Sequence, residues 1–148
     1  MDMSDEPSGN GEPRRGRGEH ILYLDDENSL VFLVTRMLKS LGYKPLGFTR
    51  PADALAAFRG DPQKFSLVLT DLSMPGSSGL DFARDVLAAS PDTPVVIVTG
   101  CVDPADVQRA SLIGVRSVMQ KPSTIEALGH AVGKLLDEIS AGARRSPQ

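Results

Sequence analysis

Five polar side chains in this sequence lie at or just after the ends of short apolar runs, where β-strands should end. The runs and their polar residues are Ile21–Leu24 with Asp25 and Asp26, Phe65–Thr70 with Asp71, Val95–Val98 with Thr99, and Val115–Met119 with Lys121. Apolar runs without polar alternation indicate strands buried on both faces, as in a parallel sheet covered by helices. Such sheets bind and react at the carboxyl ends of their strands. We therefore expect these five side chains to form the functional site.

Three of these residues, Asp25, Asp26 and Asp71, are carboxylates that would repel one another if they lay close together. A cation should therefore lie among them. No histidine or thiolate occurs at these strand ends, so the ion should be a hard one with oxygen ligands. Magnesium is favoured over calcium, because it keeps part of its water shell and binds phosphate oxygens.

Lys121 and Thr99 would add a positive charge and a hydrogen-bond donor at the same edge. Donors and cations aimed at one spot suit the oxygens of a phosphoryl group in transfer. Asp71 is ionised at neutral pH and needs no base to activate it, so formation of an aspartyl phosphate on Asp71 follows. Taken alone, Asp71 would be better explained as a turn-forming aspartate after a strand, but its four companions argue against that interpretation.

The rest of the pattern predicts a fold that brings these residues together. Five apolar runs alternate with five helical patterns, which indicates one doubly wound α/β domain with right-handed crossovers. Pro45 and Gly47 are poor in a central strand, so the strand at Lys44–Phe48 belongs at a sheet edge. This agrees with a flavodoxin-like five-stranded parallel sheet in the order 2-1-3-4-5, in which the first and third strands are neighbours. We place this domain at residues 20–140.

Capping residues and apolar stripes mark the helices. The expected caps are Thr49, Ser77 or Ser78, Asp103, and Ser123 with Glu126 in a capping box. The inward stripe of the first helix is Leu30, Val34, Met37 and Leu41. Val31 and Phe32 fall outside that stripe, where they would either dock another helix or be covered by a neighbouring loop.

The two ends of the chain carry few apolar residues. Residues 1–19 hold Pro, Gly, Ser and charges of both signs, which predicts a disordered tail. Its arginines, Arg14, Arg15 and Arg17, could touch an anionic partner, although a solvated linker explains them more simply. We expect residues 141–148 to form a frayed tail.

Composition argues against several functional classes. Sixteen basic and 19 acidic residues give a net charge of -3, which offers no basic patch for nucleic acid or for a membrane surface. Cys101 is the only cysteine, so no internal disulfide and no cysteine-based metal site is expected. No apolar run is long enough to cross a bilayer, and the amino end lacks the order of a signal peptide, so we expect a cytoplasmic location.

With these residues identified, the stretch from about His20 to Ser140 resembles the receiver domains of two-component response regulators. The likeness is carried by ILYLDDE, LVLTDLSMPGSSGLDF, VVIVTG and QKP. It implies that Asp71 is the phosphoacceptor and that Thr99 is the switch hydroxyl. Lys121 would be the charge partner of the phosphoryl group. The implied magnesium ligands are Asp25, Asp26, Asp71 and the backbone carbonyl of Ser73.

The resemblance also implies partners and limits the activity. The phosphoryl donor would be a phosphohistidine on a sensor histidine kinase or a histidine phosphotransfer protein. The charge composition, and not the resemblance, predicts no direct binding of nucleic acid or membrane; a homodimer is left open. Activity would be confined to self-catalysed phosphotransfer and autodephosphorylation. The Lys121–Pro122 bond resembles the cis peptide of the family. The wording around MPGSSGLDF and GVRSVMQKP is most similar to receivers attached to hybrid histidine kinases.

Two positions depart from the family's pattern. Val118, three residues before Lys121, stands where an aromatic residue is usual, so a readout by ring movement is not available there. Ser123 stands where another aromatic residue commonly follows the lysine and proline. The altered switch position allows a pseudo-receiver that binds partners without phosphorylation, although the complete acidic set argues against it.

Ser73 and Cys101 are small residues in the loops of the predicted site. A phosphatase of the haloacid dehalogenase type would need an acid two residues after its nucleophile, and Ser73 at that position argues against this alternative. Ser73 and Cys101 lie two positions after Asp71 and Thr99. They either control the access of water to a phosphoryl group or are simply small loop residues.

Overall fold

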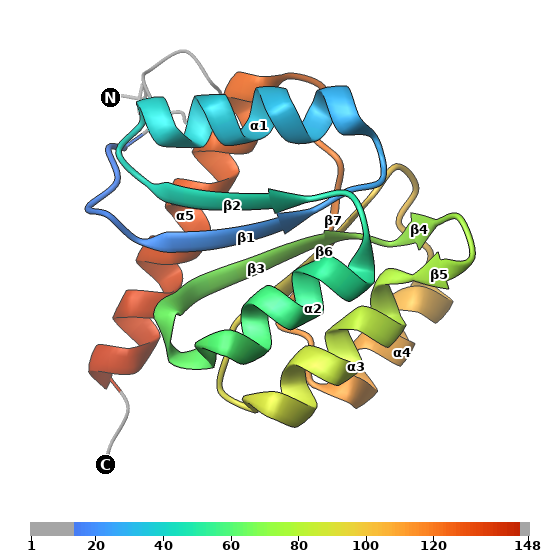
Figure 1. The fold of residues 1–148 in the computed structure, drawn as a ribbon. Helices are drawn as coiled ribbons and strands as arrows, with labels where there is room; N and C mark the ends of the chain where they lie inside the picture. The colour runs from blue at the N-terminus through green and yellow to red at the C-terminus, as the bar shows by residue number, and fades with distance from the viewer. Residues whose placement is uncertain (1–13, 146–148) are drawn as a thin grey trace.

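The computed structural model describes residues 14–145 of the chain as one α/β domain (Figure 1). Its elements are β1 His20–Leu24, α1 Asn28–Ser40, β2 Lys44–Phe48, α2 Pro51–Gly60, a 3₁₀ turn Pro62–Lys64, β3 Phe65–Asp71, β4 Ser73–Met74, β5 Ser77–Ser78, α3 Gly79–Ala89, β6 Val95–Thr99, α4 Pro104–Ile113, β7 Ser117–Gln120 and α5 Ile125–Arg145. The main sheet has five parallel strands in the order β2-β1-β3-β6-β7. This confirms the predicted flavodoxin-like order, with β2 at an edge as its proline and glycine indicated.

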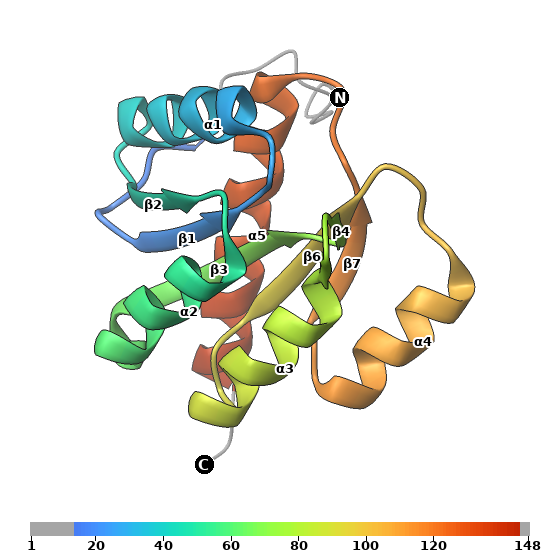
Figure 2. The same cartoon turned by 45° about the vertical axis from the view of Figure 1, so that its right-hand side comes forward.

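The sheet is covered on both faces, as its apolar strands require. Figures 1 and 2 show α1 and α5 on one face and α2, α3 and α4 on the other. Alternate residues of each strand point to opposite faces, so that β1 sends Ile21 and Tyr23 to the α1/α5 core and Leu22 and Leu24 to the other core. Burying one such aliphatic side chain stabilises the fold by roughly 1.5–3 kcal/mol, which fixes the strands that carry the site.

The buried face of α1 differs from the predicted stripe. Val31, Val34 and Leu38 are the buried residues of this helix, so placing Val31 outside the core was wrong. The reason lies in β2, where Gly47 has no side chain and Val31 packs against the space that this leaves. Phe32 is 58% exposed, as its place outside the stripe predicted, and Leu33 beside it is 49% exposed.

Two of the predicted helix starts are confirmed. The Ser78 hydroxyl accepts a hydrogen bond from the backbone N–H of Leu80 at the start of α3, with a distance of 3.1 Å. The Asp103 carboxylate accepts one from Ala105 at 2.9 Å, with Pro104 in the first turn of α4. Both caps satisfy backbone donors that the first helical turn leaves without a partner.

The other two predicted caps are one residue too early. At α2 the cap position is Arg50, without a side-chain hydrogen bond, because a proline at position 51 keeps the residue before it extended and starts the helix there. Thr49 therefore does not cap. At α5 the Thr124 hydroxyl, and not that of Ser123, accepts a hydrogen bond from Ala127, at 3.0 Å.

At both ends of the described chain, residues that were expected to belong to the tails take part in the fold. Residues 14–19 lie against the domain: Gly18 donates a backbone hydrogen bond to Gly42 at 2.9 Å, and Glu19 accepts one from Lys44 at 2.8 Å. Helix α5 continues to Arg145, past the residue where fraying was expected. Residues 1–13 and 146–148 of the two predicted tails lie outside the described residues.

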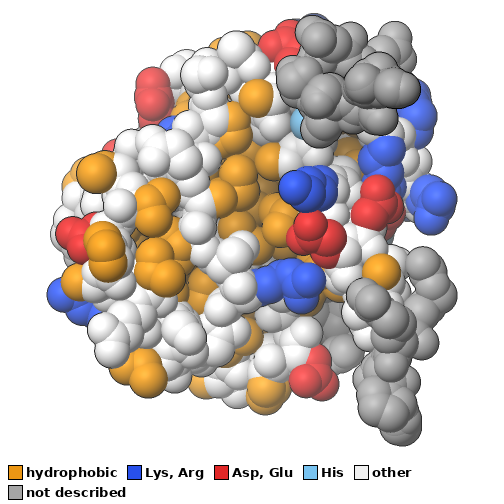
Figure 3. Space-filling model, turned by 180° about the vertical axis from the view of Figure 1, so that it is seen from behind, with side chains coloured by type: hydrophobic (Ala, Val, Ile, Leu, Met, Phe, Trp, Pro, Cys, Tyr) orange, Lys and Arg blue, Asp and Glu red, His pale blue; other side chains and the backbone are white. Residues whose placement is uncertain are grey.

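Charges of both signs are mixed on the surface. Figure 3 shows basic and acidic side chains lying next to each other beside a broad apolar area. Ion pairs join Arg14 to Glu19 at 3.1 Å and to Asp137 at 3.2 Å. Between residues 14 and 145, no helix is both long and apolar enough to cross a membrane.

Candidate functional site

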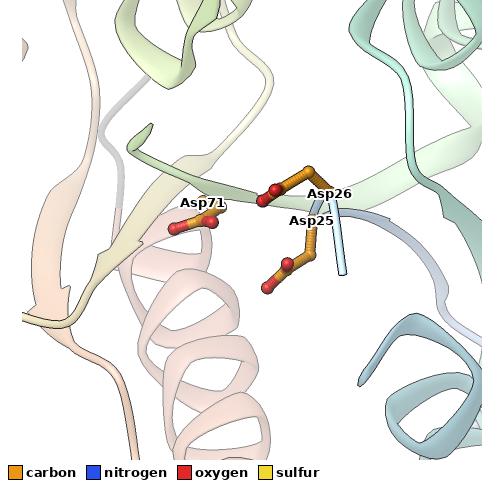
Figure 4. A group of neighbouring side chains, drawn as sticks. All are labelled: Asp25, Asp26 and Asp71. Atoms are coloured by element: carbon orange, nitrogen blue, oxygen red, sulfur yellow. The ribbon is translucent and has the colours of Figure 1, made fainter. Parts of the chain in front are cut away.

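The three predicted carboxylates meet at the carboxyl ends of β1 and β3 (Figure 4). Pairing of these strands sets Leu24 opposite Thr70, so the residues that follow, Asp25 and Asp71, arrive side by side. One oxygen from each of Asp25, Asp26 and Asp71 lies within 4.8 Å of the others. The predicted convergence of these residues is therefore present in the fold.

Lys121 joins this cluster from the end of β7. Its ammonium nitrogen lies 3.1 Å from Asp25 Oδ2 and 3.8 Å from Asp71 Oδ1. Asp25 is almost completely buried, whereas Asp71 and Lys121 are partly open to solvent. The lysine is thus hydrogen-bonded to Asp25 and lies within ion-pair distance of Asp71.

The balance of charge in the cluster favours a further cation. Burial raises the pKa of Asp71 above its ordinary value. The positive charge of Lys121 lowers this pKa, and the negative charges of Asp25 and Asp26 raise it. Burial alone would lower the pKa of Lys121, but its hydrogen bond and charge interactions with the carboxylates raise it. One ammonium therefore does not relieve the repulsion among three carboxylates. Their oxygens are the ligands that a hard divalent cation prefers, so the residues present fit magnesium.

Tyr23 is a part of the site that the sequence reasoning missed. It stands two residues before Asp25 in β1, so both side chains point to the same face of the sheet. Its hydroxyl lies 3.2 Å from Asp25 Oδ2. The sequence feature that could have indicated it is a tyrosine two residues before Asp25, in a strand whose other apolar residues are aliphatic.

Thr99, at the end of β6, reaches the same edge, but its hydroxyl is turned to the following loop. The Thr99 hydroxyl donates to the carbonyl of Cys101 at 3.2 Å, and accepts from the N–H of Cys101 at 3.3 Å. The Gln120 amide donates to the carbonyl of Gly100 in the same loop. To act on a group bound to Asp71, Thr99 would have to exchange its hydrogen bonds with Cys101.

The loop after Asp71 contains a two-stranded hairpin that was not predicted. Ser73 in β4 pairs with Ser78 in β5, and Ser73 itself is exposed. Gly79, at the start of α3, lies so close to the Asp71 carbonyl that any Cβ would overlap that oxygen. Glycine at this position therefore allows the loop to return against the strand that carries Asp71. The role of the Ser73 carbonyl as a metal ligand stays a prediction.

The family model described as "Response regulator receiver domain" matches residues 21–133, which is most of the chain. This chain belongs to the response regulator receiver family.

Relatives of this receiver domain occur in several kinds of protein. The chain is 32% identical over 102 residues to the phosphoglycerate transport system transcriptional regulatory protein PgtA of Salmonella typhimurium, which covers 69% of this chain and 24% of that protein. It is 27% identical over 123 residues to the autoinducer 1 sensor kinase/phosphatase LuxN of Vibrio campbellii, covering 83% and 14%. It is 28% identical over 118 residues to the response regulator receiver protein CpdR of Brucella abortus, covering 80% and 97%.

This range of relatives bears on the predicted attachment. The chain spans a quarter or less of the length of PgtA and LuxN, and nearly the whole length of CpdR. A special likeness to receivers attached to hybrid histidine kinases is therefore not confirmed, because transcriptional regulatory proteins and a receiver protein match as well.

Solved receiver structures share the fold. A receiver domain protein from Methanospirillum hungatei superposes with a TM-score of 0.75 at 21% identity, covering 84% of this chain and 98% of that one. The response regulator TrrA of Thermotoga maritima, solved in complex with magnesium and beryllofluoride, gives a TM-score of 0.68 at 25% identity, covering 79% and 98%.

Two expectations that came from the resemblance concern Val118 and the Lys121–Pro122 bond. Val118 lies in β7, opposite Ile97 of β6, and packs partly buried against the α2/α3/α4 core. The described residues contain no cis peptide bond, so the expectation of a cis Lys121–Pro122 bond was wrong. The trans form is the ordinary state of a bond before proline and is preferred by about 0.5–1 kcal/mol.

Proposed function

We propose that this receiver domain accepts a phosphoryl group on Asp71 in a magnesium-dependent reaction. The donor is a phosphohistidine on a sensor histidine kinase or on a histidine phosphotransfer protein. The observation that carries the proposal is the meeting of three carboxylate oxygens within 4.8 Å, with Lys121 beside Asp25 and Asp71. The proposal includes a cytoplasmic location and only self-catalysed transfer and dephosphorylation.

The metal site in this proposal is made of oxygen ligands. Asp25, Asp26 and Asp71, with the backbone carbonyl of Ser73, would hold Mg²⁺. When bound, the ion supplies positive charge to the phosphoryl oxygens. Asp25 is suited to a fixed ligand because it is buried and hydrogen-bonded, and Asp71 to the reacting group because it is partly open to solvent.

The transfer step needs no base from the protein. A carboxylate oxygen of Asp71 forms a bond to phosphorus while the bond from phosphorus to the donor's imidazole nitrogen breaks. The electron pair of the broken bond stays on that nitrogen, which takes up a proton from solvent. Lys121, in this proposal, holds the negative charge of the phosphoryl oxygens, and Thr99 donates a hydrogen bond to one of them after it leaves Cys101.

Phosphorylation would then replace the single negative charge of the Asp71 carboxylate by a phosphoryl group of about -1.5 to -2, a net change of about -0.5 to -1 at this edge. The Thr99 hydroxyl is bonded to the loop between β6 and α4, so its movement would release that loop. In this proposal the change in the loop and in α4 alters the interaction with partners.

The test is labelling of Asp71 by a small-molecule phosphodonor with Mg²⁺. Asp71→Asn should abolish labelling, while Asp85→Asn, a matched change at an exposed residue of α3, should leave it intact. Labelling that survives in Asp71→Asn would refute the assignment of the acceptor.

A second measurement separates this function from the pseudo-receiver alternative. Beryllofluoride with Mg²⁺ should shift the backbone NMR signals around Asp71 if the site takes a phosphoryl group. Unchanged spectra would instead favour a module that binds partners without phosphorylation.

A further inference from the structure

The hydroxyl of Tyr23 is placed where it can control the geometry of Asp25. Tyr23 is 3% exposed and lies in β1, and its hydroxyl donates to Asp25 Oδ2 at 3.2 Å. The phenol is therefore a buried polar group whose partner is one of the three clustered carboxylates. Neither the charge of the site nor the pattern of polar residues at the strand ends explains why a phenol lies at this position.

The hydrogen bonds of Asp25 show what the phenol adds. Its Oδ1 accepts from the backbone N–H of Glu27 at 2.9 Å, so one oxygen is held by the chain itself. Its Oδ2 accepts from Lys121 at 3.1 Å as well as from Tyr23. A carboxylate has room for about four such bonds, which leaves Asp25 able to bind a metal while these donors stay in place.

Lys121 is a donor that Asp25 must share. Its ammonium lies 3.8 Å from Asp71 Oδ1, within ion-pair distance of the second carboxylate. A new negative group on Asp71 would draw the lysine away from Asp25. The Tyr23 hydroxyl, by contrast, donates its hydrogen bond to Asp25. It would therefore still donate to Oδ2 after Lys121 had moved.

The ring of Tyr23 is fixed by its surroundings. It belongs to the core between the sheet and helices α1 and α5. Tyr23 also lines a cavity of about 220 Å³, with Leu30, Val98, Lys121 and Leu128 among the other lining residues. A phenol has only two side-chain torsions, and packing of this kind restricts both, so the hydroxyl is a rigid support for Asp25.

We infer that Tyr23 is a positioning residue for the metal site: its hydroxyl holds Asp25 in the orientation that binds Mg²⁺. The inference rests on the proposed function, because it concerns the same metal. Hydrogen-bonded supports behind a ligand set its orientation, and their loss typically lowers metal affinity 10- to 100-fold. If Tyr23 were only a buried phenol that had found a convenient acceptor, its loss would change stability and leave affinity for Mg²⁺ unchanged.

The chain offers a matched control in its second tyrosine. Tyr43 is 2% exposed, and its hydroxyl has no hydrogen-bond partner among the described residues. Tyr23→Phe and Tyr43→Phe therefore each remove one buried hydroxyl and keep the ring. Only the first of the two touches the carboxylate cluster.

The experiment is calorimetric titration of each protein with Mg²⁺ alone, after circular dichroism has shown that each variant is folded. We expect Tyr23→Phe to bind Mg²⁺ about tenfold more weakly than the wild type, and Tyr43→Phe to bind it equally well. Equal affinity in Tyr23→Phe would overturn the inference. Tighter binding would also overturn it, because the hydroxyl would then be a competitor of the metal.

A second measurement uses the wild-type chain, so it does not depend on a variant. With carbon-13 in the tyrosine ring carbon that carries the hydroxyl, addition of Mg²⁺ should shift the NMR signal of Tyr23 and leave that of Tyr43 in place. A Tyr23 signal that does not move while Mg²⁺ binds would refute the positioning role alone. If the wild type bound no Mg²⁺, the proposed function itself would fail.

Discussion

Arg14 fastens the start of the described chain to the domain, and replacing it by alanine gives a measurable prediction. Its guanidinium pairs with Glu19 at 3.1 Å, and both side chains are about four-fifths buried. It also lies 5.6 Å from the centre of the Tyr43 ring and donates to the carbonyl of Gly133 in α5 at 3.4 Å. The pair with Asp137 is discounted, because that carboxylate is 64% exposed and pairs of this kind contribute little.

The size of the loss follows from these contacts. A partly buried ion pair and a cation–π contact to a buried ring contribute roughly 1 kcal/mol each, so Arg14→Ala should lower the free energy of unfolding by about 2 kcal/mol. For a domain of this size that corresponds to a fall of about 6–10 °C in Tm. Thermal unfolding followed by circular dichroism measures it.

The neighbouring arginine is a matched control. Arg15 is exposed, and it contributes only a backbone carbonyl to this contact, so Arg15→Ala removes the same charge without removing a side-chain partner. We expect Arg15→Ala to melt close to the wild type. Equal melting temperatures for the two variants would show that the segment adds nothing to stability and would refute the reasoning.

The effect of Arg14 should also depend on pH. Burial alone would raise the pKa of Glu19, but hydrogen bonds from the backbone N–H groups of Arg17 and Glu19 and from Arg14 lower it below its ordinary value of 4.5. A lowered folded-state pKa gives stability that is present above about pH 4.5 and is lost as pH falls through the folded-state value. The difference between wild type and Arg14→Ala should therefore shrink in acid.

Three further predictions concern the carboxylate edge. Asp71→Asn should raise Tm in magnesium-free buffer at pH 7, because the folded-state pKa of Asp71 lies above its ordinary value of 3.8, so the ionised carboxylate destabilises the fold. This destabilisation disappears as pH falls to 3.8 and below, where the carboxyl becomes protonated in both states, so the difference in Tm between variant and wild type should close there. Gly79→Ala should destabilise the domain by roughly 1–3 kcal/mol and weaken Mg²⁺ binding in calorimetry, because a Cβ would overlap the Asp71 carbonyl. Gly60→Ala is the control and should bind Mg²⁺ normally, because a Cβ at this position meets no other atom within 4 Å. Thr99→Ala should slow labelling by a small-molecule phosphodonor without changing Mg²⁺ affinity, since its hydroxyl contacts the Cys101 backbone and not the carboxylates; loss of Mg²⁺ binding in this variant would contradict that separation.

The features that could be predicted are those that depend only on residues close together in the sequence. Apolar runs located the strands of the main sheet, and the proline and glycine in Lys44–Phe48 placed that strand at an edge. Ser78 and Asp103 were recognisable as caps because a helix start is defined within a few residues. The cap of α5 was misplaced by one residue, since Ser123 and Thr124 are adjacent and only the backbone geometry chooses between them.

The features that escaped prediction depend on residues far apart in the chain. Arg14 donates to a carbonyl 119 residues away, and nothing near it in the sequence indicates α5 as a partner. Val31 is buried because Gly47 of another element leaves room for it. The sequence does not show that the Tyr23 hydroxyl reaches Asp25 Oδ2, the same carboxylate oxygen that Lys121 approaches from β7.

The core and the site of this receiver domain are specified by the same apolar pattern. In β1 and β3, Tyr23 and Leu69 face α1 and α5, and their register is fixed by the burial of both. A shift of one residue in the pairing of these strands would move the side chains of the shifted strand to the opposite face of the sheet. It would also separate Asp25 from Asp71, since the two follow the paired positions Leu24 and Thr70. The cost of exposing the core thus keeps the repelling carboxylates together, which is the condition that the proposed magnesium-dependent acceptor site needs.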